Sequence, residues 1–405
     1  MKSTISDRII WLLTTVLFSS FVIFDSNVYI SYILIGITGL IFIVMTFKYN
    51  YKLPISVDTY QYHILVFIAY CAITGLWAKD ASASIGKAIS VFEIMICMTV
   101  LYCHYSRKNS VLELLEVIRY AGYIISIYAV SFYGMDTIRS TIAAEGRLDS
   151  DFANINTIAV LAAISIVLTF FQLMYYRISI SMILSIPEII MVAATGSRKG
   201  FMIVVLGIIL LFIFKYASHN LFKTILRYIL IAILLIIVFR FILMLPIFFG
   251  VEERMKGLIA TFTGSGTIEH SALLRKEYIE AGIEQFKKTP IFGIGIGNSG
   301  YILMNAYGKN TYLHNNFVEM LASGGVVGFL IYYAMFLWPI CIIWKYRKFG
   351  DSCKVAVIIL MIILLIMDFG QVSYYSKTTY FYLMVFYLEA KLLLRRRVPE
   401  NNLVR

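Results

Sequence analysis

His314 is the residue of this sequence best suited to move a proton. It opens the run His314-Asn315-Asn316-Phe317-Val318-Glu319, shortly before an apolar stretch that begins near Gly324. A histidine at the mouth of a buried helix can accept or donate a proton near neutral pH. The simpler alternative is an imidazole that only supports the local structure, and the motif by itself leaves both interpretations open.

Cationic residues at three other places could bind an anion. The turn Thr195-Gly196-Ser197-Arg198-Lys199-Gly200 joins two apolar stretches, and cations beside the backbone N–H groups of a helix start favour a phosphate-like ligand. Arg275 lies in a polar segment farther along, and Arg147 precedes the run Asn154-Ile155-Asn156. For each cation the alternative is a side chain that only reaches solvent or a membrane interface.

Other chemistries find no support in the residues. No His, Cys or carboxylate group has metal-ligand spacing and no G-x-S-x-G occurs, so neither a metal nor a cofactor is predicted. Gly295-Ile296-Gly297-Asn298-Ser299-Gly300 matches G-x-G-x-x-G but follows a predicted helix and a proline, outside any βαβ unit. It predicts a flexible turn that lets backbone approach a ligand. The five cysteines form no C-x-x-C pair and are predicted to be small buried hydrophobes.

The elements that position these residues are predicted to be membrane-spanning helices. The chain is 60% hydrophobic and 14% charged, with a mean hydropathy of +0.83. Because a span needs ~20 mostly apolar residues, the apolar runs predict an all-α polytopic membrane protein with about twelve transmembrane helices. They run over residues 8–24, 28–47, 62–78, 87–105, 115–134, 155–176, 178–195, 199–216, 224–249, 324–344, 354–372 and 377–395.

Lysine and arginine predict how these spans are oriented. Basic residues concentrate in every second connection and at both chain ends, which places both termini in the cytoplasm. The net charge of +12 then reflects cytoplasmic loops and not a nucleic-acid partner. Three segments follow: spans over 1–249, a large extracytoplasmic loop over 250–323, and the last spans with a basic tail over 324–405. Inside the loop, residues 267–288 predict an amphipathic helix that lies on the membrane or against the helix bundle.

The ordered motifs resemble the O-antigen ligase and polymerase superfamily of bacterial surface polysaccharide assembly. The resemblance rests on His314-Asn315 followed by Gly325-Val326-Val327-Gly328, on the Ser197-Arg198 turn, on Arg275, and on Pro290-Ile291-Phe292-Gly293-Ile294-Gly295. The layout of about twelve spans, with the large loop before the tenth, is also similar to the family. It implies glycan transfer from undecaprenyl diphosphate to an acceptor glycolipid at the outer face of the bacterial inner membrane, without a metal.

Roles for single residues follow from the resemblance. Arg198 and Arg275, supported by Lys199 and Arg147, are expected to hold the diphosphate and neutralise its developing charge. His314 is expected to orient or deprotonate the acceptor hydroxyl. Asn315 and Glu319 complete the expected substrate-binding set, with a structural role first for Glu319, because five residues do not return to the same helix face.

The acceptor separates two members of the superfamily. A polymerase extends another lipid-linked repeat unit, whereas a ligase transfers the glycan to lipid A-core. Phe329-Leu330-Ile331-Tyr332-Tyr333 departs from the polar threonine of ligases, and Asp368-Phe369-Gly370-Gln371-Val372-Ser373-Tyr374-Tyr375 is more similar to polymerases. A repeat-unit polymerase is therefore preferred, with a ligase as the alternative. A transporter or flippase of the same glycolipids is the rival class, which broken spans and repeats would favour.

Overall fold

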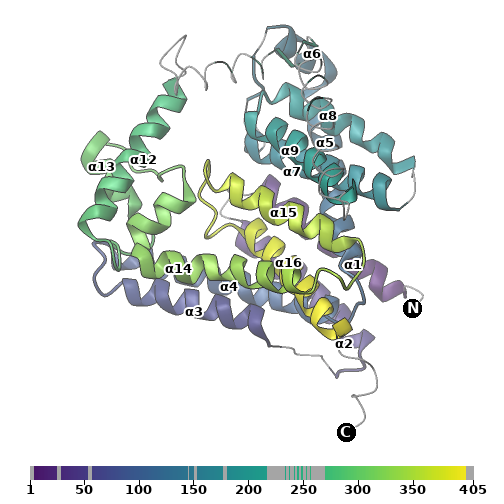
Figure 1. Cartoon of the computed structure of the whole chain (residues 1–405), viewed down its shortest axis with the longest axis horizontal. Helices are drawn as coiled ribbons and strands as arrows, with labels where there is room; N and C mark the ends of the chain where they lie inside the picture. The colour runs from purple at the N-terminus through teal and green to yellow at the C-terminus, as the bar shows by residue number, and fades with distance from the viewer. Residues whose placement is uncertain are drawn as a thin grey trace. The chain divides into compact units, whose positions relative to one another are not determined.

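The computed structural model describes residues 4–24, 29–52, 57–144, 146–149, 153–176, 180–216 and 270–397, with a few positions between 233 and 256. Within these ranges every regular element is a helix, and no strand occurs (Figure 1). The all-α class predicted from the sequence is confirmed for this part of the chain. The helices gather into two compact units, Met1–Ile37 with Leu112–Glu269 and Thr38–Val111 with His270–Arg405.

The first unit is organised around helix α7 (Ile155–Tyr175), which packs against α5 (Leu112–Tyr133), α8 (Ser185–Ala194) and α9 (Arg198–Tyr216). Small residues allow these close approaches. A Cβ on Gly207 of α9 would lie 2.4 Å from Val167 of α7, so the backbones could not come as near with any larger residue. Three shorter or peripheral elements complete the unit: α1 (Ile5–Ile23), α6 (Met135–Ala143) and the 3-10 helix η1 (Ile180–Leu184).

The second unit is built on long helices that run side by side (Figure 1). In it, α14 (Asn316–Lys345) packs along α3 (Thr59–Thr74) and α16 (Lys377–Arg397). The neighbouring helices are α4 (Ala81–Tyr105) and α15 (Cys353–Met367), and α2 (Ile30–Lys48) begins in the first unit and ends in the second. At one end of α14 stand α12 (His270–Lys288) and α13 (Ser299–Tyr307).

Seven of the described helices are long and apolar enough to cross a membrane, which is the hallmark of a polytopic membrane protein. They are α1, α2, α4, α5, α7, α9 and α14. The helices at predicted spans 178–195 and 354–372 are shorter, with Ser185–Ala194 and Cys353–Met367 as their α-helical parts. The predicted span 224–249 and the start of the predicted loop lie outside the continuously described residues, so the count of about twelve stays a prediction.

The helix predicted over residues 267–288 is present from His270 to Lys288, and its first three predicted residues lie outside the described part. It packs against α14, which selects the bundle-packed alternative for this helix. Gly282 makes the approach possible, because a Cβ there would lie 2.6 Å from Val318 and 2.7 Å from Leu313. Tyr278, Leu303, Leu313, Val318 and Ala322 form the buried core between α12, α13 and α14.

Helix α14 begins eight residues before the span predicted from residue 324, and it is broken at Gly325. This glycine has φ 62° and ψ −170°, a conformation that other residues almost never adopt. The turn after α12 fills the break. Val326 N–H donates to the Pro290 carbonyl at 2.8 Å, and Gly295 N–H donates to the Ser323 carbonyl at 2.9 Å. The turn therefore satisfies backbone groups that a continuous helix would pair internally.

The glycine-rich run 295–300 serves packing rather than an open turn. The Ser84 hydroxyl donates to the Ile296 carbonyl at 2.7 Å, and the Asn298 side chain accepts a hydrogen bond from Asp80 N–H at 2.8 Å. A Cβ on Gly295 would lie 2.4 Å from the Cβ of Ala78. The prediction of a flexible turn open to a ligand is wrong here, because the corner between α3 and α4 occupies the space beside the backbone.

Four of the five cysteines are buried, as expected for small hydrophobes, and Cys341 is exposed on α14.

Candidate functional site

The second unit contains a pocket of about 520 Å³ that brings Arg275 and His314 together. Arg275 comes from the first half of α12, and His314 comes from the loop between α13 and α14. The full lining is Ser271, Leu274, Arg275, Tyr278, Lys309, Asn310, Thr311 and His314. Two cations, an imidazole, three hydroxyls and an amide thus share one cavity, which suits a ligand that is both anionic and rich in hydroxyl groups.

His314 lines this pocket and has an unusual backbone conformation. Its φ is 57°, in the left-handed region that non-glycine residues rarely occupy. The half-buried ring lies almost parallel to Tyr278, with centroids 6.1 Å apart, and its centroid is 4.3 Å from that of Tyr312. Aromatic neighbours on two sides restrict the rotation of the imidazole, so its nitrogens keep a defined direction.

Two buried side chains make the chain turn at His314. The Leu313 N–H donates to the Glu319 carboxylate at 3.1 Å, and the Asn315 side chain accepts a hydrogen bond from Val318 N–H at 3.1 Å. Asn315 is therefore the N-cap of α14, and Glu319 ties the residue before His314 to the first helical turn. Neither side chain is among the residues that line the pocket. Both side chains therefore support the backbone on either side of His314 and do not line the pocket.

A second buried network anchors the start of α14, and sequence reasoning did not find it. The Asn316 N–H donates to the Asp368 carbonyl at 2.7 Å. Three side chains donate to the Asp368 carboxylate: the hydroxyl of Ser373 at 2.6 Å, the hydroxyl of Tyr333 at 2.9 Å and the amide of Asn316 at 3.2 Å. An aspartate at the end of an apolar run was the available signal, because an ionisable group there needs such partners.

Arg275 and the glutamates of α12 lie on different sides of the helix. Arg275 lines the pocket, whereas Glu277, Glu280 and Glu284 lie about 140–200° around the helix from it, at 100° per residue. Desolvation raises the pKa of the Tyr307 phenol, and these three carboxylates raise it further. Lys309 lies on the pocket side and was not singled out in the sequence, because a lysine beside a glycine in a polar loop is usually a plain surface charge. The two cations of the lining, Arg275 and Lys309, favour an anion in the pocket.

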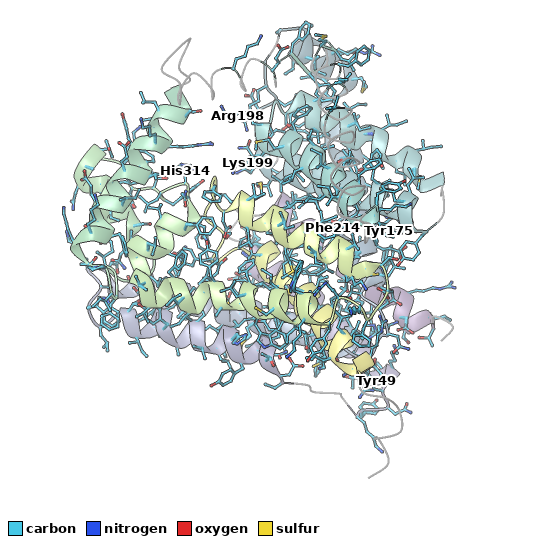
Figure 2. All side chains as sticks on the ribbon, in the orientation of Figure 1. Tyr49, Tyr175, Arg198, Lys199, Phe214 and His314 are labelled. Carbon is cyan, nitrogen blue, oxygen red and sulfur yellow. The ribbon has the colours of Figure 1, made fainter. Side chains whose placement is uncertain are left out.

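The first unit positions a second cationic group. Arg198 and Lys199 are the first residues of α9 and are half-buried (Figure 2). Local bonds shape the turn before them, since the Thr195 hydroxyl accepts a hydrogen bond from Ser197 N–H at 3.3 Å. Gly200 lets α9 approach α7, where its Cβ would lie 3.0 Å from the Ala159 carbonyl oxygen. The turn predicted from the sequence is thus a helix start with cations in its first turn.

Arg147 belongs to the same end of the first unit. It is exposed, and its neighbour Leu148 is buried and donates its N–H to the Ala194 carbonyl at 3.4 Å. Ala194 is the last residue of α8, directly before the turn that carries Arg198. The fold therefore places the segment of Arg147 beside the end of α8 that leads into the turn of Arg198, about fifty residues farther along the sequence. The seven predicted site residues fall into two sets: Arg147, Arg198 and Lys199 belong to the first unit, and Arg275, His314, Asn315 and Glu319 belong to the second.

In the part of the chain that the structure covers, no group of three or more His, Cys, Asp and Glu side chains could bind a metal ion.

Comparison with known proteins supports a family for this segment. Residues 180–333 match the family model described as O-antigen ligase. The match covers less than half of the chain, but it includes Arg198, Lys199, Arg275, His314 and the broken start of α14. Among curated proteins, none matches. The match supports the O-antigen ligase and polymerase superfamily as the family of this membrane protein.

Proposed function

We propose that this member of the O-antigen ligase and polymerase superfamily is a glycosyltransferase of the bacterial inner membrane. It transfers a glycan from undecaprenyl diphosphate to an acceptor glycolipid at the outer membrane face. The observation that carries the proposal is the shared pocket of Arg275 and His314, within the segment that matches the family model. Both termini lie in the cytoplasm in this proposal, so the pocket opens on the opposite side.

In the proposed reaction, His314 accepts the proton of the acceptor hydroxyl as its oxygen attacks the anomeric carbon of the donor glycan. The bond between this carbon and the diphosphate oxygen breaks, and undecaprenyl diphosphate leaves with the electron pair. Negative charge grows on the leaving oxygen, and a fixed guanidinium stabilises it more than water would. Arg275 supplies this charge from α12, and Arg198, Lys199 and Arg147 are proposed to hold the rest of the diphosphate.

The proposed chemistry needs neither a nucleotide sugar nor a metal. The donor is already activated by its diphosphate, and arginines can bind phosphate oxygens through paired hydrogen bonds. The ordinary alternative, a cation bridging the phosphates, would need carboxylates that face the pocket. Its lining contains none, because Glu277, Glu280 and Glu284 lie on the other side of α12.

The acceptor is proposed to be another lipid-linked repeat unit, which makes the protein a repeat-unit polymerase. Support comes from the sequence: the segment 368–375 is more similar to polymerases, and the segment 329–333 departs from the polar threonine of ligases. The alternative is a ligase that transfers the glycan to lipid A-core. Both reactions use the same donor and the same proton acceptor, so the acceptor alone distinguishes them.

The decisive experiment uses a deletion strain complemented with wild type, His314→Ala or Lys276→Ala. Lipopolysaccharide and lipid-linked glycans are separated on gels, and membrane levels of each variant are measured. Lys276 is an exposed residue on the same helix as Arg275, so its variant should behave as wild type.

For a polymerase, deletion and His314→Ala leave single repeat units on the core. For a ligase, long glycan accumulates on the lipid carrier and the core stays bare. Normal surface glycan with His314→Ala would exclude the proposed role of this residue. Lipid-linked glycan trapped on the cytoplasmic face would instead identify a transporter.

A further inference from the structure

The lipid-facing side of α4 is visible in its exposure pattern. Ile85, Ile89, Phe92 and Ile96 are all more than 40% exposed and follow each other at spacings of three or four residues. Ala88, Val91, Met95 and Met98 on the same helix are buried. An apolar stripe that stays exposed along a candidate membrane span is the face that contacts acyl chains.

This stripe continues past the end of the spans onto the segment that follows α12. Ile85 packs against Gly75 at the end of α3, where a Cβ on the glycine would lie 3.8 Å from the Ile85 side chain. The next residues are Leu76, 85% exposed, and Trp77, whose ring centroid lies 5.8 Å from that of Phe292. Ile291, beside Phe292, is 59% exposed. Contacts therefore connect the exposed stripe of α4, through the end of α3, to the turn that fills the break in α14.

Helix α13 extends the same surface. Lys79, two residues after Trp77, holds its ammonium 5.2 Å from the ring centroid of Tyr301. Met304 follows Tyr301 by one helical turn, and both side chains are exposed. We call Leu76, Trp77, Ile291, Phe292, Tyr301 and Met304 the α13 patch. It combines tryptophan, tyrosine and aliphatic side chains with a neighbouring lysine, which is the composition of protein surfaces at the membrane–water boundary.

We infer that the α13 patch lies in the interface of the outer lipid leaflet, with phospholipid as the occupant that covers it. Continuity with the exposed stripe of α4 favours lipid over a second protein copy, because the same bilayer must cover both surfaces. Lys79 is placed to meet lipid phosphate, and the aromatic rings prefer the headgroup boundary. Four backbone hydrogen bonds join the turn 290–295 to α14, so Ile291 and Phe292 are held at a fixed position along this helix.

A consequence concerns the segment between α12 and α14. Because α12 ends at Lys288, directly before the turn 290–295, lipid at the patch places the C-terminal end of this helix at the membrane surface, and the pocket lies toward its other end. Lipid contact at the patch is independent of whether the pocket performs the proposed transfer, and it can be measured on an inactive protein.

The test is depth-dependent fluorescence quenching on the full-length protein in phosphatidylcholine vesicles. The four tryptophans, Trp11, Trp77, Trp338 and Trp344, are replaced by Phe, which keeps an aromatic ring at each site. One tryptophan is then introduced at a time, as Phe292→Trp, Met304→Trp or, for the matched control, Lys276→Trp. Quenchers are lipids brominated near the headgroup end of the chain, lipids brominated near its methyl end, and aqueous iodide.

Tryptophan at 292 and 304 should be quenched severalfold more by the shallow bromines than by the deep ones, and only weakly by iodide. Tryptophan at 276, an exposed position of α12, should be quenched strongly by iodide and only weakly by either brominated lipid.

Equal iodide quenching at 292 and 276 would place the patch in water and overturn the inference. Protection from both quenchers would show that protein covers the patch, which also overturns it. Glycan analysis of the same variants separates this result from the proposed function, since an inactive protein with normal quenching leaves the lipid contact intact.

Discussion

The cationic turn of the first unit and His314 of the second unit are held in place in different ways. In the first unit, Arg198 and Lys199 stand on a turn whose shape comes from its own residues, through bonds such as Ser197 N–H to the Thr195 hydroxyl. In the second unit, His314 depends on residues far from it. Its neighbour Leu313 is bonded to Glu319, and the helix start beyond it is tied to Asp368 of another segment.

This difference teaches that a binding charge and a proton acceptor need different support. A guanidinium on a flexible stem can reach an anion from many backbone positions, so a local turn suffices. A proton acceptor must meet one oxygen at hydrogen-bond distance, and its ring must be fixed by packing and by its neighbours. The second unit should therefore be the more sensitive of the two to changes outside the pocket.

The largest expected effect comes from the arginines themselves. Arg198→Ala and Arg275→Ala should each lower glycan transfer by about 10²–10³-fold, the usual loss when a group that stabilises developing charge is removed. Transfer is measured on membranes with lipid-linked donor, at equal amounts of inserted protein. Arg139→Ala in the first unit and Lys276→Ala in the second are matched controls, because both residues are exposed.

If Arg198→Ala alone kept full activity, the turn of the first unit would have no part in the diphosphate site. The proposal would then reduce to the pocket of the second unit.

Glu319 tests whether support behind the pocket matters for the chemistry. Glu319→Ala removes the acceptor of Leu313 N–H, and a hydrogen bond to a charged group contributes about 1.5–3 kcal/mol. Transfer should fall about 10- to 100-fold, mainly in kcat, because the pocket lining itself is unchanged. Glu319→Gln keeps an acceptor oxygen and should retain most of the activity.

A loss in KM with unchanged kcat for Glu319→Ala would show that this carboxylate contributes to substrate binding instead. Equal losses for Ala and Gln would point to the negative charge, and not to the hydrogen bond, as the required feature.

Sequence patterns predicted the parts that depend on local chemistry. Apolar runs predicted the helices, since a span of the required length must be apolar throughout, and the polar stripe with Thr289-Pro290 predicted α12 and its end. Arg275 and His314 were singled out by residue type and by family resemblance, and the structure places both in one pocket.

The rest depends on contacts between distant segments. Lys309 joins the pocket only because α13 and the following loop fold back on α12, and no local pattern marks that return. The break in α14 was missed because Gly324-Gly325 within an apolar run also fits close helix packing, and only the turn 290–295 makes a broken helix favourable there. The glycine-rich run that was predicted to face a ligand instead contacts the corner between α3 and α4, which is also distant in the sequence.

Gly325→Ala tests whether the break in α14 contributes to the stability of the second unit. Gly325→Ala should lower the free energy of unfolding by about 1–3 kcal/mol, the cost of a side chain in a backbone region that is almost restricted to glycine. The added Cβ would also lie 2.2 Å from the Ile291 carbonyl oxygen and push the turn out of the break. Thermal unfolding of the purified protein in detergent measures the change.

Gly86→Ala is the matched control for this substitution. Gly86 lies in α4 with no atom near its absent Cβ, so alanine should leave stability unchanged or raise it slightly through helix propensity. An unfolding temperature for Gly325→Ala equal to that of Gly86→Ala would contradict the inserted turn.

Lys309→Ala should have the smallest effect on glycan transfer. It tests whether an exposed cation of the pocket contributes less than the half-buried Arg275. The Lys309 side chain is exposed, and exposed charge pairs contribute about 0.2–1 kcal/mol, so Lys309→Ala should raise KM by about 1.5- to 5-fold with little change in kcat. The effect should shrink as salt is raised, because an ammonium in solvent is screened whereas a half-buried guanidinium is screened less. Steady-state transfer at low and high salt, beside Lys276→Ala, measures both properties.

A loss as large as that of Arg275→Ala, and insensitive to salt, would instead place Lys309 against the leaving diphosphate. The second unit would then hold two of the charges that the reaction requires.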